Sequence, residues 1–382
     1  MAEASGRLSS SRPTLESRTK RGRLAELREA TISPPERTMS SVRRFGEAEH
    51  GSLPLLGHAL LRGEVENRSP PAIVAVAGWT APDASRASPR LNPMNEPLDN
   101  TIEKAGAKAA AVEQWTADPC GSSEVGAEIG TAEYFANLDE MRRDYAPWMD
   151  EVLGYSGTRG MRVLDVGCGQ GIDLVRYARA GATTTGIDLT PRHTEIATAH
   201  LAAAGLEGTV VEGDAEQLPF DDASFDRLSS NGVLHHTPGI EVALREANRV
   251  LRPGGEARII LYNKSSLHYW ISQFLLRGLL KGGLRRERSM AGVLSAGVEV
   301  SSIGARPLVN VYTPRQTRTM LGRAGFVDVR TEVRHFQADD AFIYAMLSRL
   351  KPKLRDPVVL DRVGRLAGWY VTGIGRRAGV AA

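Results

Sequence analysis

Cysteine is nearly missing from this chain of 382 residues, and so are the spacings through which cysteines bind metals. Cys120 and Cys168 are its two cysteines, and they lie far apart in the sequence. Neither a disulfide framework nor a zinc site is therefore expected. We see no secretory signal and no apolar run long enough to span a bilayer. Together these absences predict a cytoplasmic protein that works without a metal ion.

A strong charge of one sign is also missing. The chain has 48 Lys and Arg against 45 Asp and Glu, a net charge of +3. Residues 1–50 alone account for that excess, so the remainder is close to neutral. This balance argues against a broad nucleic-acid interface, and no nucleic-acid partner is expected.

Sustained hydrophobic periodicity is missing from residues 1–100, which are rich in Ser, Arg, Pro, Gly and Ala. Such a segment cannot bury enough apolar surface to offset the entropy lost on ordering. We predict a disordered N-terminal extension over 1–100, with a regulatory or targeting arm as the alternative. Order is expected from residue 101 onward.

What the sequence does contain is a glycine-rich turn after a short apolar run. Val163–Val166 carries Asp165 within it, and Gly167, Gly169 and Gly171 follow at alternate positions. An apolar run that ends in such a turn before a helix predicts a buried parallel strand and a nucleotide-binding loop. The spacing differs from the Gly-x-Gly-x-x-Gly pattern of dinucleotide-binding folds.

An acid stands at the end of the next predicted strand, Thr183–Asp188. Asp188 lies 188 − 167 = 21 residues after Gly167. In nucleotide-binding α/β folds an acid at about this distance accepts hydrogen bonds from the ribose hydroxyls. We therefore expect Asp188 to bind a ribose.

These features, followed by Asp214-Ala215 before Leu218-Pro219-Phe220 and by the turn Leu251–Gly255, resemble the class I S-adenosylmethionine (SAM) dependent methyltransferases over residues 110–347. The variant that they resemble most methylates quinones and other small metabolites. The resemblance implies an α/β fold: a Rossmann-like, doubly wound, seven-stranded sheet with an antiparallel last strand, a helical lid and a cap insertion.

The resemblance also implies roles for single residues, with SAM as the cofactor. Asp165 would hold the SAM amino group or its water shell, and the backbone of Gly167, Gly169 and Gly171 would lie against the amino-acid part. Asp214 would accept from the adenine amino group while the amide of Ala215 meets a ring nitrogen. Asn231 would contact the amino-acid portion. The cofactor-binding candidates are thus Asp165, Gly167, Gly169, Gly171, Asp188, Asp214, Ala215 and Asn231.

Two further groups of side chains are candidates for the acceptor side. Residues 101–160 predict a helical lid, in which Trp115, Tyr134 and Phe135 either contact SAM or simply pack beneath the lid. His235 or His236 follows the fourth predicted strand and is the candidate catalytic base. The alternative is that one histidine caps a helix or packs against the loop.

The remaining segments surround a predicted core at 161–262. Residues 263–312 form an insertion in which Leu267–Leu280 is strongly apolar and is followed by several Arg and Lys. It is a cap for a bulky apolar substrate, a membrane-surface helix, or a core-packing helix. Residues 313–350 should supply the last helix and two strands, Phe326–Val333 and Ala341–Leu347. The basic tail 351–382 is either a docked helix or a contact for anionic lipid.

The function that follows is methyl transfer from SAM to an O, N or C atom of a small molecule, with an apolar or phenolic one as the candidate. The first alternative is a SAM-binding protein without activity that acts as a partner or regulatory subunit. The second is a NAD-dependent oxidoreductase, which the glycine spacing disfavours. The sequence leaves the acceptor and the oligomeric state open.

Overall fold

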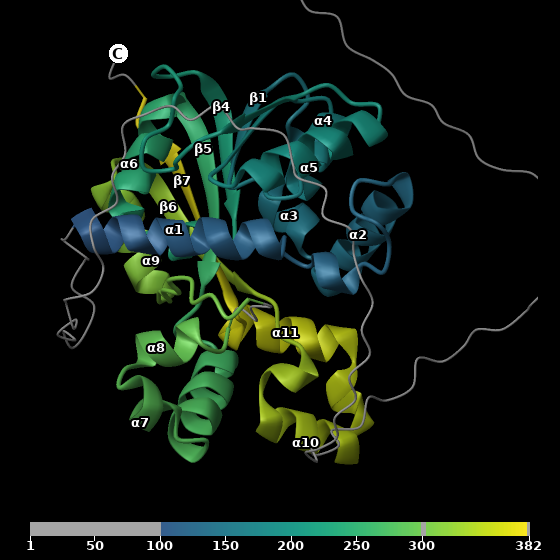
Figure 1. Cartoon of the computed structure of the whole chain (residues 1–382), viewed down its shortest axis with the longest axis vertical. Coiled ribbons are helices and arrows are strands. Elements are labelled where there is room, and N and C mark those ends of the chain that lie inside the picture. The colour runs from purple at the N-terminus through teal and green to yellow at the C-terminus, as the bar shows by residue number, and fades with distance from the viewer. Residues whose placement is uncertain (1–100, 299–302, 380–382) are drawn as a thin grey trace, which may run out of the picture. The chain divides into compact units, whose positions relative to one another are not determined.

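A seven-stranded sheet organises the computed structural model, which describes residues 101–298 and 303–379 (Figure 1). The predicted extension 1–100 lies outside the described residues. The strand order is β3-β2-β1-β4-β5-β7-β6; β1 to β5 pair in parallel, and β7 runs antiparallel between β5 and β6. This confirms the expected Rossmann-like sheet with an antiparallel last strand. The strands are β1 (Arg162–Val166), β2 (Thr183–Asp188), β3 (Thr209–Glu212), β4 (Phe225–Asn231), β5 (Leu251–Tyr262), β6 (Phe326–Arg334) and β7 (Tyr370–Arg377).

Helices cover both faces of this sheet, as a doubly wound fold requires. Figure 1 shows α4 (Ile172–Arg179) and α5 (Pro191–Ala203) on one side, and α6 (Ile240–Val250) and α9 (Pro314–Arg323) on the other. The start of α9 is fixed by its sequence: Thr313 and Gln316 satisfy each other's backbone amides in a capping box, and proline occupies the first turn.

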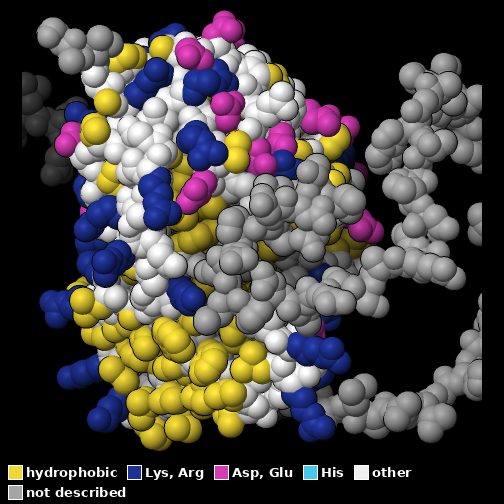
Figure 2. All heavy atoms as spheres, turned by 90° about the vertical axis from the view of Figure 1, so that its left-hand side faces the viewer, with side chains coloured by type: hydrophobic (Ala, Val, Ile, Leu, Met, Phe, Trp, Pro, Cys, Tyr) yellow, Lys and Arg dark blue, Asp and Glu magenta, His cyan; other side chains and the backbone are white. Residues whose placement is uncertain are grey.

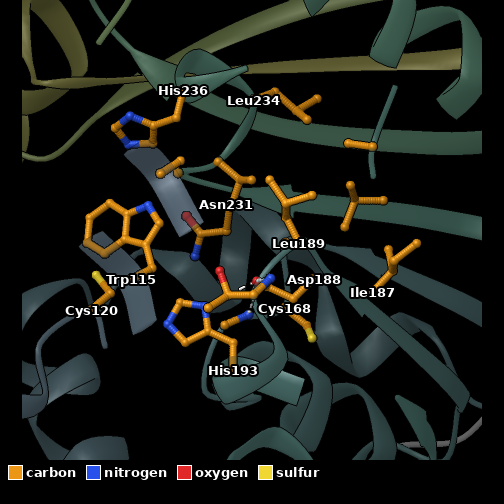
Figure 3. Close-up of a pocket in the computed structure, with 18 of the residues that line it drawn as sticks. Trp115, Cys120, Cys168, Ile187, Asp188, Leu189, His193, Asn231, Leu234 and His236 are labelled. Atoms are coloured by element: carbon orange, nitrogen blue, oxygen red, sulfur yellow. Dashed lines mark hydrogen bonds and ion pairs between the residues drawn. The ribbon is translucent and has the colours of Figure 1, made fainter. Parts of the chain in front are cut away.

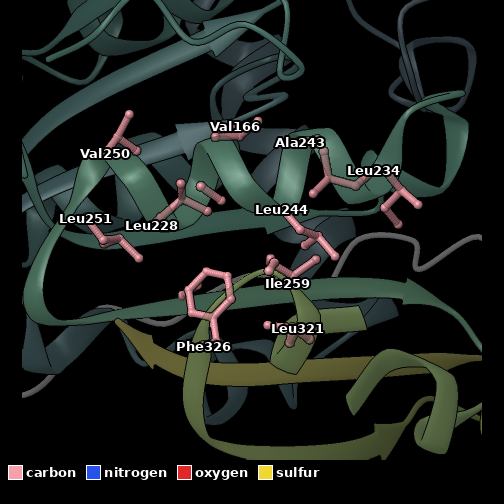
Figure 4. Close-up of a cluster of buried hydrophobic side chains, with 14 of the residues drawn as sticks. Val166, Leu228, Leu234, Ala243, Leu244, Val250, Leu251, Ile259, Leu321 and Phe326 are labelled. Atoms are coloured by element: carbon pink, nitrogen blue, oxygen red, sulfur yellow. The ribbon is translucent and has the colours of Figure 1, made fainter. Parts of the chain in front are cut away.

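The main core lies between the sheet and the α6–α9 side (Figure 4). Strands that are buried on both faces consist of nearly continuous apolar residues, and the end of β5, residues 259–261, follows this rule, whereas β4 buries Ser229 and Ser230. Leu228, Leu244 and Leu251 have no exposed surface at all. Their neighbours in Figure 4 include Val166, Ile259, Leu321 and Phe326.

The predicted lid region is helical. It comprises α1 (Thr101–Ala117), η1 (Ser122–Glu124), α2 (Ala132–Tyr145), α3 (Met149–Leu153) and η2 (Tyr155–Gly157). In Figure 1, α1 crosses the sheet near the ends of its strands. One side of α1 therefore faces the edge of the sheet at which ligands bind in this class of fold.

The end of the chain differs from the prediction. Ala341–Leu347 is not a strand but lies within α10 (Phe342–Leu350), and the seventh strand is β7, inside the segment predicted as a tail. A short apolar run fits a helix as well as a strand. Two glycines weaken the strand signal of β7, yet they are required, because a Cβ at Gly373 would overlap Leu321 and one at Gly375 would overlap Phe326.

Two separate segments, residues 263–312 and 335–369, form a helical region below the sheet in Figure 1, which we call the cap. The first was predicted as an insertion; the second was not. The cap contains the π-helix η4 (His268–Leu280), α7 (Gly283–Glu287), α8 (Met290–Ser295), η5 (Ala338–Asp340), α10, η6 (Pro352–Arg355) and α11 (Pro357–Ala367). None of the helices in the described ranges has both the length and the apolar character needed to cross a membrane.

Backbone hydrogen bonds hold the entry and exit of each cap segment together. Asn263 and Tyr312 pair at the base of the first segment. The Trp369 amide donates to the His335 carbonyl over 2.8 Å at the base of the second, and the Asn263 amide donates to the Trp369 carbonyl over 2.7 Å between the two. The chain therefore leaves the sheet and returns to it at one place.

Candidate active site

A cavity opens where the strand order reverses between β1 and β4, the position at which α/β sheets bind ligands. Its walls come from the ends of β1, β2 and β4, from the loop after β3, and from α1. Figure 3 shows Asp188 and His193 on one side of the cavity, with Trp115, Asn231 and His236 on another.

The glycine loop forms part of this wall, with a different reason for each glycine. Gly167 has a φ of 71°, and a Cβ there would overlap the Val233 side chain. Gly169 has open space where a Cβ would stand, and it lines the cavity as Gly167 does. Gly171 does not line the cavity; it allows α4 to approach Ala197 of α5.

Asp188 lines the cavity, and its carboxylate is held by three protein donors. The Gly169 amide donates to Oδ2 over 2.9 Å, and the Thr190 amide donates to Oδ1 over 2.9 Å. Nδ1 of His193 lies 3.2 Å from Oδ1. Burial alone would raise the pKa of Asp188, but these hydrogen bonds and His193 outweigh it, so the pKa is lowered. An ionised acceptor therefore stands at the predicted ribose position.

Asp165 is not among the residues that line the cavity, so its predicted contact with the amino group of SAM or its water shell stays a prediction. It is 2% exposed, and burial together with Asp173 and Asp188 raises its pKa well above the usual range. The acid that lines the cavity here is Asp173, in the first turn of α4. Asp173 accepts from Asn231 Nδ2 over 2.8 Å and from the Tyr155 hydroxyl over 2.6 Å.

Arg142 of α2 also lines the cavity and was not predicted. Burial would lower its pKa, but the charge of Asp173 contributes to raising it, so the guanidinium is cationic. A cation and a carboxylate therefore face the same part of the cavity. No sequence motif marks Arg142, since it comes from a helix far from the glycine loop in the sequence.

Asp214 and Ala215 line the cavity as predicted, but Asp214 also has a partner from the lid. Nζ of Lys108 in α1 lies 2.6 Å from Oδ2 of Asp214 and 3.1 Å from Oε2 of Glu216. Oδ1 of Asp214 accepts from the Glu216 amide over 2.9 Å. This pair of ionic contacts ties α1 to the loop that is expected to bind adenine.

Of the three lid aromatics, the structure brings only Trp115 to the cavity. The Tyr134 hydroxyl donates to the side chain of Gln170. Phe135 stacks on His200 with ring centroids 4.3 Å apart. Tyr134 and Phe135 thus have the simpler of their two predicted roles, which is packing beneath the lid.

The two candidate bases, His235 and His236, differ in burial and in their position relative to the cavity. His235 is fully buried, does not line the cavity, and has its pKa lowered well below the usual range, chiefly by burial and then by His236. Neither of its ring nitrogens has a hydrogen-bond partner among the described residues. His236 does line the cavity, and its Nδ1 lies 2.6 Å from the Leu308 carbonyl. A carbonyl only accepts, so Nδ1 carries the proton and Nε2 is the basic nitrogen.

Within residues 101–298 and 303–379, no group of three or more His, Cys, Asp and Glu side chains is placed to hold a metal ion. The polar groups of the cavity include carboxylates, side-chain amides, imidazoles, an ammonium group and a guanidinium. Such groups suit an organic ligand with several hydrogen-bonding and charged parts.

The fold and the cavity together define a Rossmann-like nucleotide-binding domain. Comparison with known proteins narrows this class, because residues 164–259 match the family model described as "Methyltransferase domain". This match supports the resemblance to the class I SAM-dependent methyltransferases over this part of the chain.

Three relatives show how far the similarity extends. The demethylmenaquinone methyltransferase of Staphylococcus aureus is 40% identical over 113 residues, which are 28% of this chain and 46% of that protein. A ubiquinone biosynthesis O-methyltransferase of Paracidovorax citrulli is 37% identical, over 32% of this chain and 50% of its own. A fatty-acid O-methyltransferase of Mycolicibacterium smegmatis is 36% identical, over 36% and 48%. The chain spans about half the length of the curated relatives that it matches.

Proposed function

We propose that this protein transfers a methyl group from SAM to a small apolar or phenolic molecule. The observation that carries the proposal is the set of charges around one cavity: the carboxylates of Asp173, Asp188 and Asp214 and the guanidinium of Arg142. SAM has a ribose, an adenine and a zwitterionic amino-acid part, and this set complements each of them.

The position of each residue indicates which part of SAM it would bind. Asp188, already ionised and fixed by backbone amides, would accept from the ribose hydroxyls. Asp214 and the amide of Ala215 would bind the adenine edge, with Ile187 and Leu189 as apolar walls beside it.

The amino-acid part of SAM would lie at the other end of the cavity. Arg142 would pair with its carboxylate, while Asp173 and Asn231 would accept from its ammonium group. Because the Asn231 amide already donates to Asp173, its oxygen is directed to accept. When bound, SAM supplies an electrophilic methyl group on a sulfonium. The protein's contribution is to orient both reactants and exclude water.

The acceptor would lie against one wall of the cavity, which is mainly apolar and aromatic. This wall is formed by Trp115, Leu234, His236 and Tyr262. The contact of Nδ1 with the Leu308 carbonyl fixes the ring of His236, so that Nε2 can take a proton from an acidic hydroxyl of the acceptor. The relatives are named for demethylmenaquinone, for ubiquinone biosynthesis and for fatty acids, and these names support an apolar acceptor.

Calorimetry with SAM and with NAD tests the donor part of this proposal. We expect SAM to bind and NAD not to bind, and tighter binding of NAD would favour the oxidoreductase instead. Turnover of methyl-labelled SAM with phenols, quinols and fatty acids then tests the reaction. If SAM binds but no acceptor is methylated, whether added singly or present in a cell extract, the alternative of an inactive SAM-binding partner would be favoured.

Replacing His236 by Gln tests the catalytic base. Turnover of an acceptor that must lose a proton should fall about 100-fold, while the affinity for SAM stays the same. The matched control is His235→Gln, because this neighbour does not line the cavity. Equal turnover in the wild type and in His236→Gln would contradict a role for His236 as the base.

A further inference from the structure

The cap exposes apolar side chains in an unusual concentration. Among the described residues, 12 large hydrophobic side chains are exposed, and 10 of them belong to the cap. Large exposed apolar patches are rare on monomeric soluble proteins, and where they occur they commonly mark interaction sites. The ten are Trp270, Leu279, Leu280, Ile303, Ile343, Met346, Leu347, Leu350, Val358 and Leu366.

Helix α10 shows the pattern most clearly. Ile343, Met346, Leu347 and Leu350 follow the spacing i, i+3, i+4, i+7, which places them on one face of a helix. Such a face is normally buried against a core, but here its exposed fractions are 38%, 59%, 43% and 77%. The apolar face of α10 therefore points away from the domain.

The helix η4 lies beside α10 and adds to the same region. The Ser272 hydroxyl donates to the Asp340 carbonyl over 2.6 Å, and Nδ1 of His268 lies 3.1 Å from the same oxygen. At the other end of η4, Leu279 and Leu280 are exposed. Figure 1 places the ends of both helices at one extremity of the domain, so a single flat surface can contact both.

Cations border this apolar region. Figure 2, which views the side of the cap on which α7 and α8 lie in Figure 1, shows apolar side chains gathered over the lower part of this face, with Lys and Arg on its flanks. Residues 265–295 contain a single acid, Glu287, which pairs with Arg306, and residues 341–355 contain no acid at all. Nine Lys and Arg of these two stretches are exposed: Arg277, Lys281, Arg285, Arg286, Arg288, Arg349, Lys351, Lys353 and Arg355.

We infer that the cap docks on the surface of an anionic lipid bilayer, with α10 and the end of η4 lying in the interface. A bilayer offers an apolar interior below a layer of negative headgroups, which matches exposed Leu, Met and Trp side chains bordered by Lys and Arg. A helix of this kind lies along the surface and does not need the length to cross it. This inference concerns an interaction surface and does not depend on the proposed reaction.

The cap is joined to the active site by packed aromatic rings. Tyr262 lines the cavity and stacks on Trp369 at 4.5 Å between centroids, and Trp369 contacts His268 of the cap at 4.6 Å. Docking would thus place on the bilayer a cap that packs directly against a residue of the cavity wall.

Sedimentation of the full chain with vesicles tests this inference. We expect the protein to sediment with vesicles of equal parts phosphatidylcholine and phosphatidylglycerol, about tenfold or more better than with phosphatidylcholine alone, and less so at high salt. The double variant Lys351→Glu, Lys353→Glu should weaken this binding about tenfold or more. Leu347→Glu with Leu350→Glu should weaken it as well.

The matched control is Val327→Glu on β6, because Val327 is as exposed as Leu347, 43%, but lies outside the cap. It should bind vesicles like the wild type. The melting temperature and calorimetry with SAM establish that each variant is folded. A wild type that stays in solution with both vesicles, or cap variants that sediment like the wild type, would overturn the inference. So would a dimer that Leu350→Glu dissociates, if no vesicles bind.

Discussion

The sheet core and the cap use the same residue types in opposite ways. In the core, Leu164, Leu228 and Leu244 are completely shielded, and the buried acids Asp165 and Asp188 lie near the cavity. In the cap, leucines and a methionine of α10 face outward, and the charged residues of 341–355 are exposed cations. The buried apolar residues of the core stabilise the fold, whereas the exposed ones of the cap contribute little to it. Their retention on the surface points to a contact that the isolated domain does not make.

The largest effect that we predict from this comparison is a difference in stability between two leucine variants, one in the core and one in the cap. Leu244→Ala in α6 should lower the free energy of unfolding by about 3 kcal/mol, because a cavity remains where the side chain was. Leu350→Ala in α10 should change it by less than about 0.5 kcal/mol. Chemical denaturation measures both. Similar losses would mean that α10 is part of the folding core after all.

A second prediction compares the affinity for SAM after an acid is removed from the cavity and after one is removed from the cap. Asp188→Ala should weaken SAM binding by about 1–3 kcal/mol, the scale of hydrogen bonds to a charged group. Asp339→Ala is the control, since this cap acid is exposed and pairs with Arg355. Calorimetry measures both affinities. An unchanged affinity in Asp188→Ala would refute the ribose contact.

A third prediction concerns His335, which lies at the junction of β6 and the cap against Tyr145 and Tyr370. Burial lowers its pKa to about 4, with a smaller contribution from His268. The unfolded chain, with a pKa of about 6.5, binds the proton first, so stability falls as the pH drops through this window. Between about pH 7.5 and pH 5 the loss should be about 2 kcal/mol larger in the wild type than in His335→Gln. Parallel pH profiles of the two proteins would contradict it.

The smallest effect is expected at the lid. Lys108→Met removes the ionic contacts with Asp214 and Glu216, worth about 0.5–1 kcal/mol for a partly exposed pair. Dissociation of SAM should become a few-fold faster in a stopped-flow chase. Arg192→Met, which removes an exposed pair with Glu195, should leave the rate unchanged. If both variants release SAM at the wild-type rate, Lys108 does not hold the lid.

The parallel half of the sheet could be predicted from the sequence, while the antiparallel end could not. The first two parallel strands end in residues with their own chemistry: Gly167–Gly171 follows β1, and Asp188 ends β2. β7 has glycines at 373 and 375, because α9 and β6 approach too closely for a Cβ. The space that neighbours leave is a tertiary property, so local residue preferences favoured the wrong segment, Ala341–Leu347.

The site was predictable to the extent that it depends on strand ends. Asp188, Asp214 and Asn231 reach the cavity because the carboxyl ends of neighbouring parallel strands meet at one edge. Arg142 and Lys108 were missed, since lid helices place them there without any local motif. The position of Asp165 in its strand does not reveal whether its side chain turns to the cavity or behind it, so its contact with SAM stays a prediction.

The paired entry and exit at Asn263–Tyr312 and His335–Trp369 has an evolutionary consequence. The two cap segments each begin and end at one place beside the sheet. Because loop-closure entropy changes slowly with length, such segments can lengthen, shrink or be exchanged at little thermodynamic cost. The sheet with its cavity and the outer surface of the cap can then diversify independently, since no described residue of the two cap segments lines the cavity. A chimera that carries a relative's helices between these anchor points should keep its affinity for SAM and change its binding to vesicles.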